Sequence, residues 1–369
     1  MKNLMKKLHT KTMTLLIGTT LLFNSFIPSC LSEEIPEIEP RTTAKNIVLM
    51  IGDGMGEEHI NATSIFLTGE KGNLYFESFP YHSKVSTFSA NNVVTDSPAA
   101  TTAIACGVKV NNGIISKEIP GSGKDLETIL EYCKKIGKST GLVTTSYITD
   151  ATPAGFGAHS KDRYNAGEII NGYLNQSRPN ILYGGGGRVN KAVFESAGYN
   201  IINNKIEMEE IKDDLNLHIF GSFGEFNMPY EYDGLNELPH LSEMTYSALK
   251  ILNKDPEGYF LMIEGGRIDH ASHYNDIIRT IYETVEFNNA TKIVDEYCNK
   301  EETLIIATAD HETGGLNVIR NNGESNIPTV TWSSTWHTSK KVDVYSTGIG
   351  SENVTGITDN TEIYNVMRQ

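Results

Sequence analysis

The sequence predicts an α/β fold, namely a three-layer sandwich in which helices cover both faces of a central, mostly parallel β-sheet. Two observations lead to this prediction. Several short, continuous apolar runs have the length and composition of strands that are buried on both faces. Segments with the 3.6-residue periodicity of helices lie between these runs, and strands that alternate with helices usually form parallel sheets.

Four of the apolar runs read as central strands, at residues 46–51, 141–145, 259–263 and 303–309. Helical periodicity follows at residues 126–136, with Asp125 as the expected N-cap, and again at 241–251 and 277–294. The glycines at 184–187 are not followed by Lys-Ser or Lys-Thr, so this segment reads as a turn at a strand end and not as a phosphate-binding loop.

Composition and charge are those of a globular protein. Hydrophobic residues make up 39% of the 369 residues and charged residues 21%. The formal net charge is −15, so no nucleic-acid-binding surface is expected, because phosphate backbones bind clustered lysines and arginines. Three cysteines after the N-terminal segment are expected to be buried free thiols, with one disulfide as the alternative: Cys106, Cys133 and Cys298.

The N-terminal segment reads as an export signal. Four lysines precede an uncharged apolar stretch at residues 13–23, which is short for a membrane-spanning helix. The stretch ends just before Cys30, which resembles the acylated cysteine of a bacterial lipoprotein; a plain signal peptide is the alternative. We therefore expect a signal peptide at 1–29, an acidic tether at 30–44 and one folded domain at 45–369. The expected location is the periplasm or the outer membrane, with any membrane contact made through a lipid on Cys30.

An acidic residue follows or ends each of the four central strands: Asp53, Asp150, Glu264 and Asp310. A single acid in this position is usually a helix cap or a turn residue. Four of them would meet at the carboxyl edge of the sheet, where ligands of parallel sheets bind. Converging carboxylates repel one another unless cations neutralise them, so the pattern predicts a site for more than one metal.

Histidines supply further candidate ligands. If the chain becomes helical after Ile268, Asp269 and His273 stand four residues apart on one face and can bind one cation. His270 is then a competing ligand or a partner of the ligands, and Asp310 and His311 are adjacent ligands at a strand end. His337 is a lone histidine, which is more often structural. Mixed histidine and carboxylate ligands suit zinc, whereas sites made only of oxygen suit magnesium.

Ser97 is the candidate nucleophile. Pro98 suits the first position of a helix, which would make Ser97 its N-cap. Ser97 then either only caps this helix or presents its hydroxyl to an anion at the helix N-terminus. No nucleophile-elbow pattern with a catalytic histidine accompanies it, so a metal would have to ionise the hydroxyl.

Five segments together resemble the alkaline phosphatase family, in the order of that family and across residues 45–369. They are Gly52-Asp53-Gly54-Met55-Gly56, Thr95-Asp96-Ser97, Asp150-Ala151-Thr152-Pro153-Ala154, Glu264-Gly265-Gly266-Arg267-Ile268-Asp269-His270, and Thr308-Ala309-Asp310-His311-Glu312-Thr313-Gly314-Gly315. The resemblance implies metal-dependent hydrolysis of small phosphate monoesters through a covalent phosphoserine, with release of inorganic phosphate. It also implies two Zn²⁺ and one Mg²⁺ per chain.

The resemblance also assigns roles to single residues. Ser97 is similar to the phosphorylated nucleophile, and Arg163 to the arginine that binds the phosphate. The first zinc would be held by Asp269, His273 and His337. The second zinc, which activates Ser97, would be held by Asp53, Asp310 and His311. Asp53 would also bridge to a magnesium ion held by Thr152 and Glu264, with Asp150 in contact directly or through water.

Some features depart from the family pattern or leave alternatives open. The family varies at the places of Asp150 and His270, which affects the third metal, and only a short segment separates His311 from His337, where larger relatives insert an interface subdomain. The oligomeric state therefore stays open. Another hydrolase of the superfamily, such as a phosphodiesterase or a sulfatase, is one alternative, although Ser97-Pro98-Ala99 does not fit the sulfatase pattern Cys/Ser-x-Pro-x-Arg. A non-catalytic metal-binding surface lipoprotein is the other, but it would not need Ser97.

Overall fold

A nine-stranded, mostly parallel sheet forms the centre of the computed structural model, which describes residues 43–187, 189–212 and 214–369. The strand order is β2-β13-β8-β1-β7-β3-β4-β6-β5. In this sheet β13 alone runs opposite to the other strands, antiparallel to both β8 and β2. The strands are β1 (Asn46–Gly52), β2 (Tyr81–Val85), β3 (Ser139–Tyr147), β4 (Ile181–Gly185), β5 (Tyr199–Ile202), β6 (His218–Ser222), β7 (Tyr259–Gly265), β8 (Thr303–Thr308) and β13 (Val342–Gly348).

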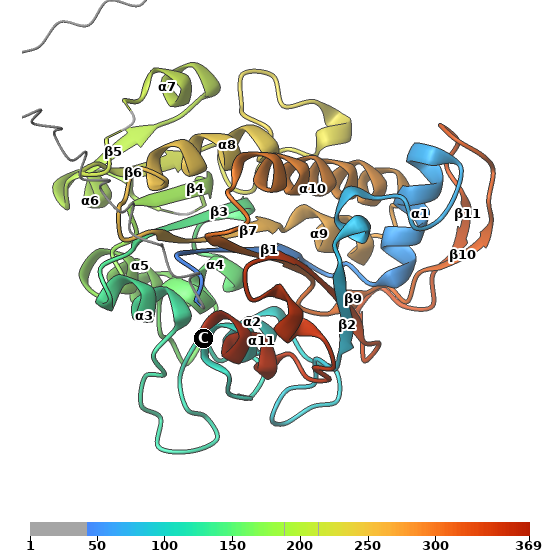
Figure 1. Ribbon diagram of the computed structural model, residues 1–369, viewed down its shortest axis with the longest axis horizontal. Coiled ribbons are helices and arrows are strands. Elements are labelled where there is room, and N and C mark those ends of the chain that lie inside the picture. Colours follow the sequence, from blue (N-terminus) through green and yellow to red (C-terminus); the bar gives the residue numbers. More distant parts are fainter. Residues whose placement is uncertain (1–42, 188, 213) are drawn as a thin grey trace, which may run out of the picture. The chain divides into compact units, whose positions relative to one another are not determined.

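Helices cover both faces of this sheet, which confirms the predicted three-layer α/β fold (Figure 1). One face carries α8 (Leu241–Leu252) and α10 (Ile277–Tyr297), and the other carries α2 (Ser97–Cys106), α3 (Ile129–Lys135), α4 (Ala151–Gly157) and α11 (Thr361–Met367). The remaining α-helices are α1 (Glu57–Thr68), α5 (Ala166–Asn175), α6 (Lys191–Ser196), α7 (Lys205–Glu210) and α9 (Arg267–His273). Among the described residues, no helix combines the length and the apolar character needed to cross a membrane.

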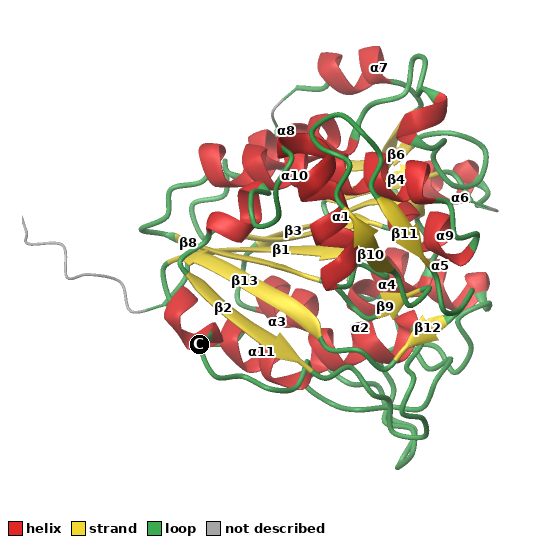
Figure 2. Cartoon of the chain, turned by 90° about the vertical axis from the view of Figure 1, so that its right-hand side faces the viewer, coloured by secondary structure: helices red, strands yellow, loops and turns green. Residues whose placement is uncertain are grey.

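Two small antiparallel sheets lie outside the central one (Figure 2). The first pairs β10 (Asn317–Arg320) with β11 (Thr329–Thr331). The second pairs β9 (Glu312–Thr313) with β12 (His337–Thr338), and it joins the segment after β8 to the segment that carries His337. The predicted export signal, Cys30 and nearly all of the predicted tether lie outside the described residues.

The four predicted central strands are all present, because their sequences suit a strand that packs on both faces. Every residue of β1 and of β7 is buried, and β1 lies between β7 and β8. Such strands have no solvent-facing side, so they read as continuous apolar runs. The edge strand β2 is different, because most of its residues are partly exposed and its apolar signal is weak. The three described cysteines are buried and free, as predicted.

The predicted start of α3 at Asp125 is wrong. The N-cap is Thr128, whose hydroxyl accepts a hydrogen bond from the Glu131 amide at 3.1 Å. The Glu131 carboxylate in turn accepts one from the Thr128 amide at 3.0 Å. This reciprocal pair satisfies two amides that a helix start otherwise leaves unpaired, so the helix begins at Ile129.

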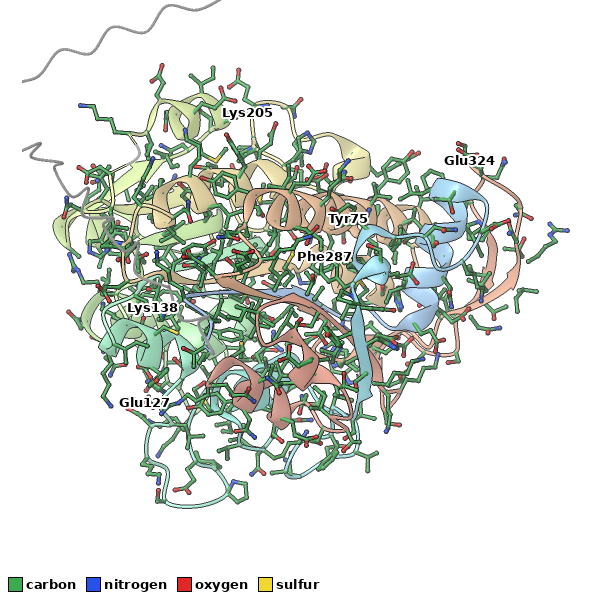
Figure 3. The ribbon with its side chains drawn as sticks, in the orientation of Figure 1. Tyr75, Glu127, Lys138, Lys205, Phe287 and Glu324 are labelled. Carbon is green, nitrogen blue, oxygen red and sulfur yellow. The ribbon has the colours of Figure 1, made fainter. Side chains whose placement is uncertain are left out.

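Phe287 connects α10 to the core and gives a test of the packing. Its ring, labelled in Figure 3, is fully buried and meets Phe76 edge to face, with the centroids 5.8 Å apart. Phe287→Ala is expected to lower the free energy of unfolding by about 3–5 kcal/mol, because it removes buried apolar surface and leaves a cavity. Urea denaturation of the metal-loaded protein measures this loss. Ile206→Ala, at an exposed position of α7, is the control, and equal small losses in both variants would contradict this packing.

Candidate active site

The acids at the ends of the central strands meet at one edge of the sheet. Their strands are neighbours in the order β8-β1-β7-β3, so their carboxyl ends lie side by side. Asp53 follows β1, Glu264 belongs to the end of β7, and Asp310 follows β8. Asp150 follows β3 and caps α4, where its side chain accepts a hydrogen bond from the Ala151 amide at 2.8 Å. The structure thus brings together the four acids that the sequence singled out.

The first cluster consists of Asp269, His273 and His337, whose candidate ligand atoms lie within 4.8 Å of one another. Helix α9 places Asp269 and His273 one turn apart, and His273 Nε2 lies 3.1 Å from Asp269 Oδ2. His337 Nε2 lies 3.7 Å from Asp269 Oδ1. All three positions belong to the sequence-based prediction for one metal.

Backbone carbonyls set the tautomers of both histidines in this cluster. His337 Nδ1 donates to the carbonyl of Thr95 at 2.9 Å, and His273 Nδ1 donates to the carbonyl of Thr335 at 2.7 Å. Because a carbonyl can only accept, each Nδ1 carries the proton and each Nε2 lone pair is left for a metal. His337, which stands alone in the sequence, therefore has a tautomer and a position that suit a metal ligand.

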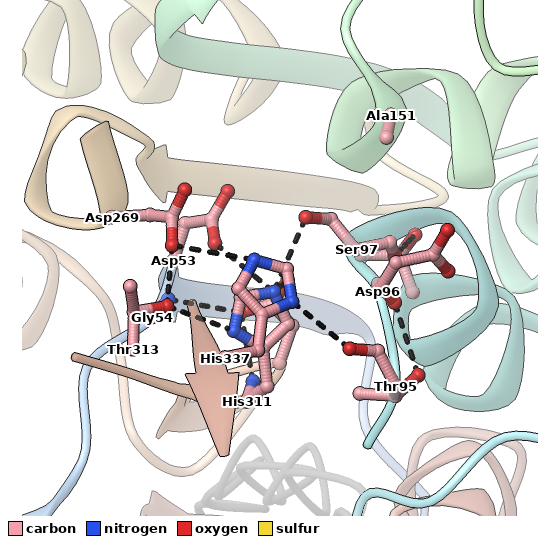
Figure 4. Close-up of polar contacts among 12 residues, drawn as sticks. Asp53, Gly54, Thr95, Asp96, Ser97, Ala151, Asp269, His311, Thr313 and His337 are labelled. Carbon is pink, nitrogen blue, oxygen red and sulfur yellow. Dashed lines mark hydrogen bonds and ion pairs between the residues drawn. The ribbon is translucent and has the colours of Figure 1, made fainter. Parts of the chain in front are cut away.

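The second cluster consists of Asp53, Asp310 and His311. His311 Nε2 lies 3.6 Å from Asp53 Oδ1 (Figure 4). It lies 3.2 Å from Asp310 Oδ2. The other oxygen of Asp310 accepts hydrogen bonds from the Gly54 amide at 3.1 Å and the His311 amide at 2.9 Å, so this carboxylate is held in place. Asp269 of the first cluster also forms a ligand group with Asp53 and His311, which shows that the two clusters adjoin.

Oxygen atoms without partners mark the remaining part of the site. Thr152 Oγ1, Glu264 Oε1, Asp53 Oδ1 and Asp310 Oδ2 are buried, and none has a hydrogen-bond partner among the described residues. Buried oxygens are rarely left unsatisfied, because the loss of water is not compensated. The donor set of a hydroxyl and several carboxylates is the kind that divalent cations bind. The residues present therefore fit the metals that the resemblance implies.

The pKa shifts of these groups also fit a metal site. Burial, followed by the charges of Asp310 and Asp269, raises the pKa of Asp53 well above its usual range. Burial, followed by the charge of Asp150, raises the pKa of Glu264 to about 8. Burial and the adjacent His337 ring hold the pKa of His311 well below its usual value, so this imidazole is neutral and can bind a metal. Cations at the site would offset the repulsion among the carboxylates.

Ser97 is placed beside the second cluster, although not as the helix cap. The predicted N-cap role of Ser97 is wrong, because Asp96 caps α2 and accepts a hydrogen bond from the Ala99 amide at 3.2 Å. A second hydrogen bond, from the Gly113 amide at 2.7 Å, fixes the Asp96 carboxylate. The Ser97 hydroxyl is consequently not used for capping, and its Oγ lies 3.2 Å from His311 Nε2 (Figure 4).

A pocket of about 430 Å³ opens onto these groups, and Ser97 and Arg163 both line it. Arg163 is held by Asp150, whose Oδ1 accepts a hydrogen bond from Nη2 at 3.0 Å. His270 lines the same pocket. Its Nε2 lies 4.0 Å from Asp150 Oδ2, and its Nδ1 lies 2.9 Å from the Arg267 guanidinium. His270 thus lies near Asp150, and its role as a partner of the ligands stays a prediction.

Two threonines to which the sequence analysis gave no role hold candidate ligands in place. Thr313 donates to Asp269 Oδ1 at 2.5 Å, and Thr144 donates to the second oxygen of Glu264. Thr144 is the residue of β3 that pairs with Glu264 of β7 in the sheet. No sequence pattern marks such a threonine, because its role depends on the register of two strands that are distant in the chain.

The fold and the clustered candidate ligands are those of a metal-dependent hydrolase. The family model for alkaline phosphatase matches residues 44–186 and 182–331. Alkaline phosphatase 3 of Bacillus subtilis is 33% identical over 335 residues, which cover 85% of this chain and 71% of that protein. Alkaline phosphatase 4 of the same species is 36% identical over 315 residues, which cover 78% of this chain and 65% of that protein. The chain belongs to the alkaline phosphatase family.

Solved structures agree with this assignment. The cold-active alkaline phosphatase of Shewanella sp. superposes with a TM-score of 0.79 at 27% identity, covering 87% of this chain and 98% of that one. The alkaline phosphatase of the Antarctic bacterium TAB5 superposes with a TM-score of 0.77 at 28% identity, covering 88% and 97%. The predicted family, fold and enzyme class are confirmed, and family membership supports hydrolysis of phosphate monoesters.

Proposed function

We propose that this chain hydrolyses phosphate monoesters through a covalent phosphoserine at Ser97 and releases inorganic phosphate. The proposal rests mainly on the position of Ser97. Its Oγ does not cap a helix and lies 3.2 Å from His311 Nε2, and Ser97 lines a pocket that Arg163 also lines. A nucleophile, candidate metal ligands and a phosphate-binding arginine therefore share one cavity. Metal binding alone would not need Ser97, which disfavours a non-catalytic surface lipoprotein.

We propose two Zn²⁺ and one Mg²⁺ as the cofactors. The histidine-containing clusters suit zinc: Asp269, His273 and His337 for one ion, and Asp53, Asp310 and His311 for the other. Thr152, Glu264 and Asp150 offer oxygen only, which suits magnesium. When bound, such cations lower the pKa of a coordinated hydroxyl and stabilise the charge on a leaving oxygen.

A relative supports the magnesium assignment. The TAB5 enzyme has been solved as variants in which a histidine is replaced by aspartate or by glutamate, each with Mg bound in the M3 site. This chain carries Asp150 naturally, next to the oxygen ligands Thr152 and Glu264. We infer that Asp150 favours magnesium there, either as a ligand or through water.

The chain's own residues then account for the transfer. Ser97 Oγ loses its proton and forms the bond to phosphorus while the bond from phosphorus to the leaving oxygen breaks, and the leaving oxygen takes up a proton to become an alcohol. Water then gives up a proton and attacks the phosphorus of the phosphoserine, the bond from phosphorus to Oγ breaks, Oγ takes up a proton and phosphate leaves. Arg163, held by Asp150, binds the non-bridging phosphate oxygens through its planar guanidinium.

Arg163→Ala tests the preference for monoesters. The variant is expected to form phosphoenzyme still, but to bind phosphate more weakly by about 2–3 kcal/mol, the range for hydrogen bonds to charged groups. Activity on a chromogenic monoester should fall more than activity on a diester, because a diester offers fewer anionic oxygens to the guanidinium. Steady-state kinetics with both substrates, in defined zinc and magnesium, measure this difference.

The control for this variant is Lys161→Ala, which removes an exposed positive charge two residues away. It should change neither substrate's kinetics by more than a small factor. Equal losses on monoester and diester in Arg163→Ala would contradict the monoesterase assignment and favour a phosphodiesterase.

We also propose that the protein is exported and anchored through a lipid on Cys30, which lies outside the described residues. The basic and apolar pattern before Cys30 supports this proposal. Cys30→Ala is expected to move the protein from the membrane fraction to the soluble fraction. Fractionation and mass spectrometry of the mature N-terminus measure the outcome, and an unmodified N-terminus away from Cys30 would contradict the anchor.

A further inference from the structure

Trp336 is a large aromatic residue exposed at the mouth of the active-site pocket. Its side chain is 60% exposed, and it lines the same pocket as Ser97 and Arg163. Tyr164, next to Arg163 in the chain, lines this pocket too and is 78% exposed. The mechanism above uses neither ring. Two exposed aromatic rings in one catalytic pocket call for a ligand that covers them, because each leaves apolar surface in water.

The position of Trp336 relates it to the leaving group. In phosphoryl transfer the attacking and leaving oxygens lie roughly in line, on opposite sides of phosphorus. Ser97 would attack from the side of His311, so the leaving oxygen would face the adjoining first cluster, which contains His273 and His337, the latter stacked on His311 at 3.6 Å. The Trp336 ring lies against both of these histidines. It stacks on His337 with the centroids 4.9 Å apart and the planes at 9°, and it meets His273 at 5.1 Å.

The backbone around Trp336 is held in place, so the ring is presented by a fixed segment. The Trp336 amide donates to Ser334 Oγ at 2.8 Å, and its carbonyl accepts from the Gly314 amide at 2.9 Å. The neighbouring Thr335 carbonyl accepts the hydrogen bond of His273. A ring that is already positioned loses little conformational freedom when a ligand stacks on it.

The other tryptophan has a different environment. Trp332 is half-buried and meets His59 edge to face at 5.9 Å, and it is not among the pocket-lining residues. Trp332 therefore serves packing, whereas Trp336 leaves much of its ring free at the pocket. Tyr164 flanks the phosphate-binding side, with the Arg163 guanidinium 5.7 Å from its ring centre.

We propose that Trp336, aided by Tyr164, binds the leaving group by stacking, so that this enzyme prefers phosphate monoesters whose alcohol carries a planar aromatic group, such as nucleoside monophosphates. The inference rests on the proposed function and adds a substrate class to it. Stacking of a base on an aromatic side chain is sequence-tolerant and strong enough to change the choice of substrate. The chain thus selects the leaving group through a surface outside the metal ligands.

Adenosine 5′-monophosphate and ribose 5-phosphate provide a matched pair of substrates. Both lose a phosphate from the same primary 5′-oxygen, and only the first carries a base. The metal-loaded wild type is expected to have the higher kcat/KM for the nucleotide. Trp336→Ala should lower this preference about 5- to 100-fold, mostly through KM, and Trp336→Phe should restore much of it. Tyr274→Ala, which removes an 82% exposed ring beside His273 but outside the pocket lining, is the control and should leave the ratio unchanged.

The outcomes separate this inference from the proposed function. Equal losses on both substrates in Trp336→Ala would mean that the ring only positions His337, and would overturn the inference while leaving the function intact. A wild type without preference between the two substrates would overturn it as well. If the wild type with zinc and magnesium hydrolysed neither substrate, the proposed function itself would fail.

Discussion

Replacing Ser97 with alanine is expected to lower the turnover of phosphate monoesters by about 10³-fold or more, because the substitution removes the oxygen proposed to attack the phosphorus of the substrate. The candidate ligands are expected to stay in place, since within the described part of the chain the Ser97 side chain makes one hydrogen bond, to His311, and does not cap α2. The variant should therefore still bind zinc and phosphate. No phosphoenzyme should be trapped after incubation with labelled phosphate at low pH.

The measurement compares turnover, metal content and covalent label in parallel. Metal content equal to that of the wild type shows that the loss comes from the missing hydroxyl and not from a damaged site. A slow residual rate is expected, because water can still attack a bound substrate directly. Label on a residue other than Ser97 in the wild type would show that the nucleophile is misassigned.

Removing the metals is the second change with a large expected effect. Chelation should abolish activity and lower the melting temperature, because the buried carboxylates of the site then repel one another without compensation. Zinc together with magnesium should restore both properties. His337→Ala should lose metal at the first cluster only, since the second cluster has its own three ligands. Full activity in the metal-free protein would refute the proposed chemistry.

Asp310→Asn tests the same electrostatic argument more specifically. The substitution is expected to lower activity in the metal-loaded protein and to raise the melting temperature of the metal-free protein. The amide oxygen of asparagine can still accept the hydrogen bonds from the Gly54 and His311 amides, so local geometry is kept. The lost charge weakens metal binding and should reduce activity in the presence of zinc. The same loss relieves repulsion in the metal-free protein, which should melt at a higher temperature than the metal-free wild type. Calorimetry of both proteins with and without metals measures this, and a lower melting temperature of the metal-free variant would contradict the electrostatic argument.

The central strands and the acids at their ends could be predicted from the sequence alone. A strand that is buried on both faces has to be apolar along its whole length, as β1 and β7 are, so its position is visible without a structure. Parallel strands present their carboxyl ends at one edge, so Asp53 and Glu264 could be placed together from their positions in the chain. The spacing of Asp269 and His273 on one helical turn is equally local.

Only the tertiary structure decided how these residues are held. The sequence predicted Ser97 as the cap of α2, but Asp96 caps the helix in the structure. The amide of Gly113, 17 residues away in the chain, holds the second oxygen of Asp96. Thr144 supports Glu264 only through the register of β3 against β7, and His337 receives its tautomer from the Thr95 carbonyl. Nothing in the sequence distinguishes Trp336 from other aromatic residues, because its role depends on its contacts with His273 and His337 in the folded chain. Local patterns determine which elements form, whereas contacts between distant segments set the hydrogen bonds and exposures on which the chemistry depends.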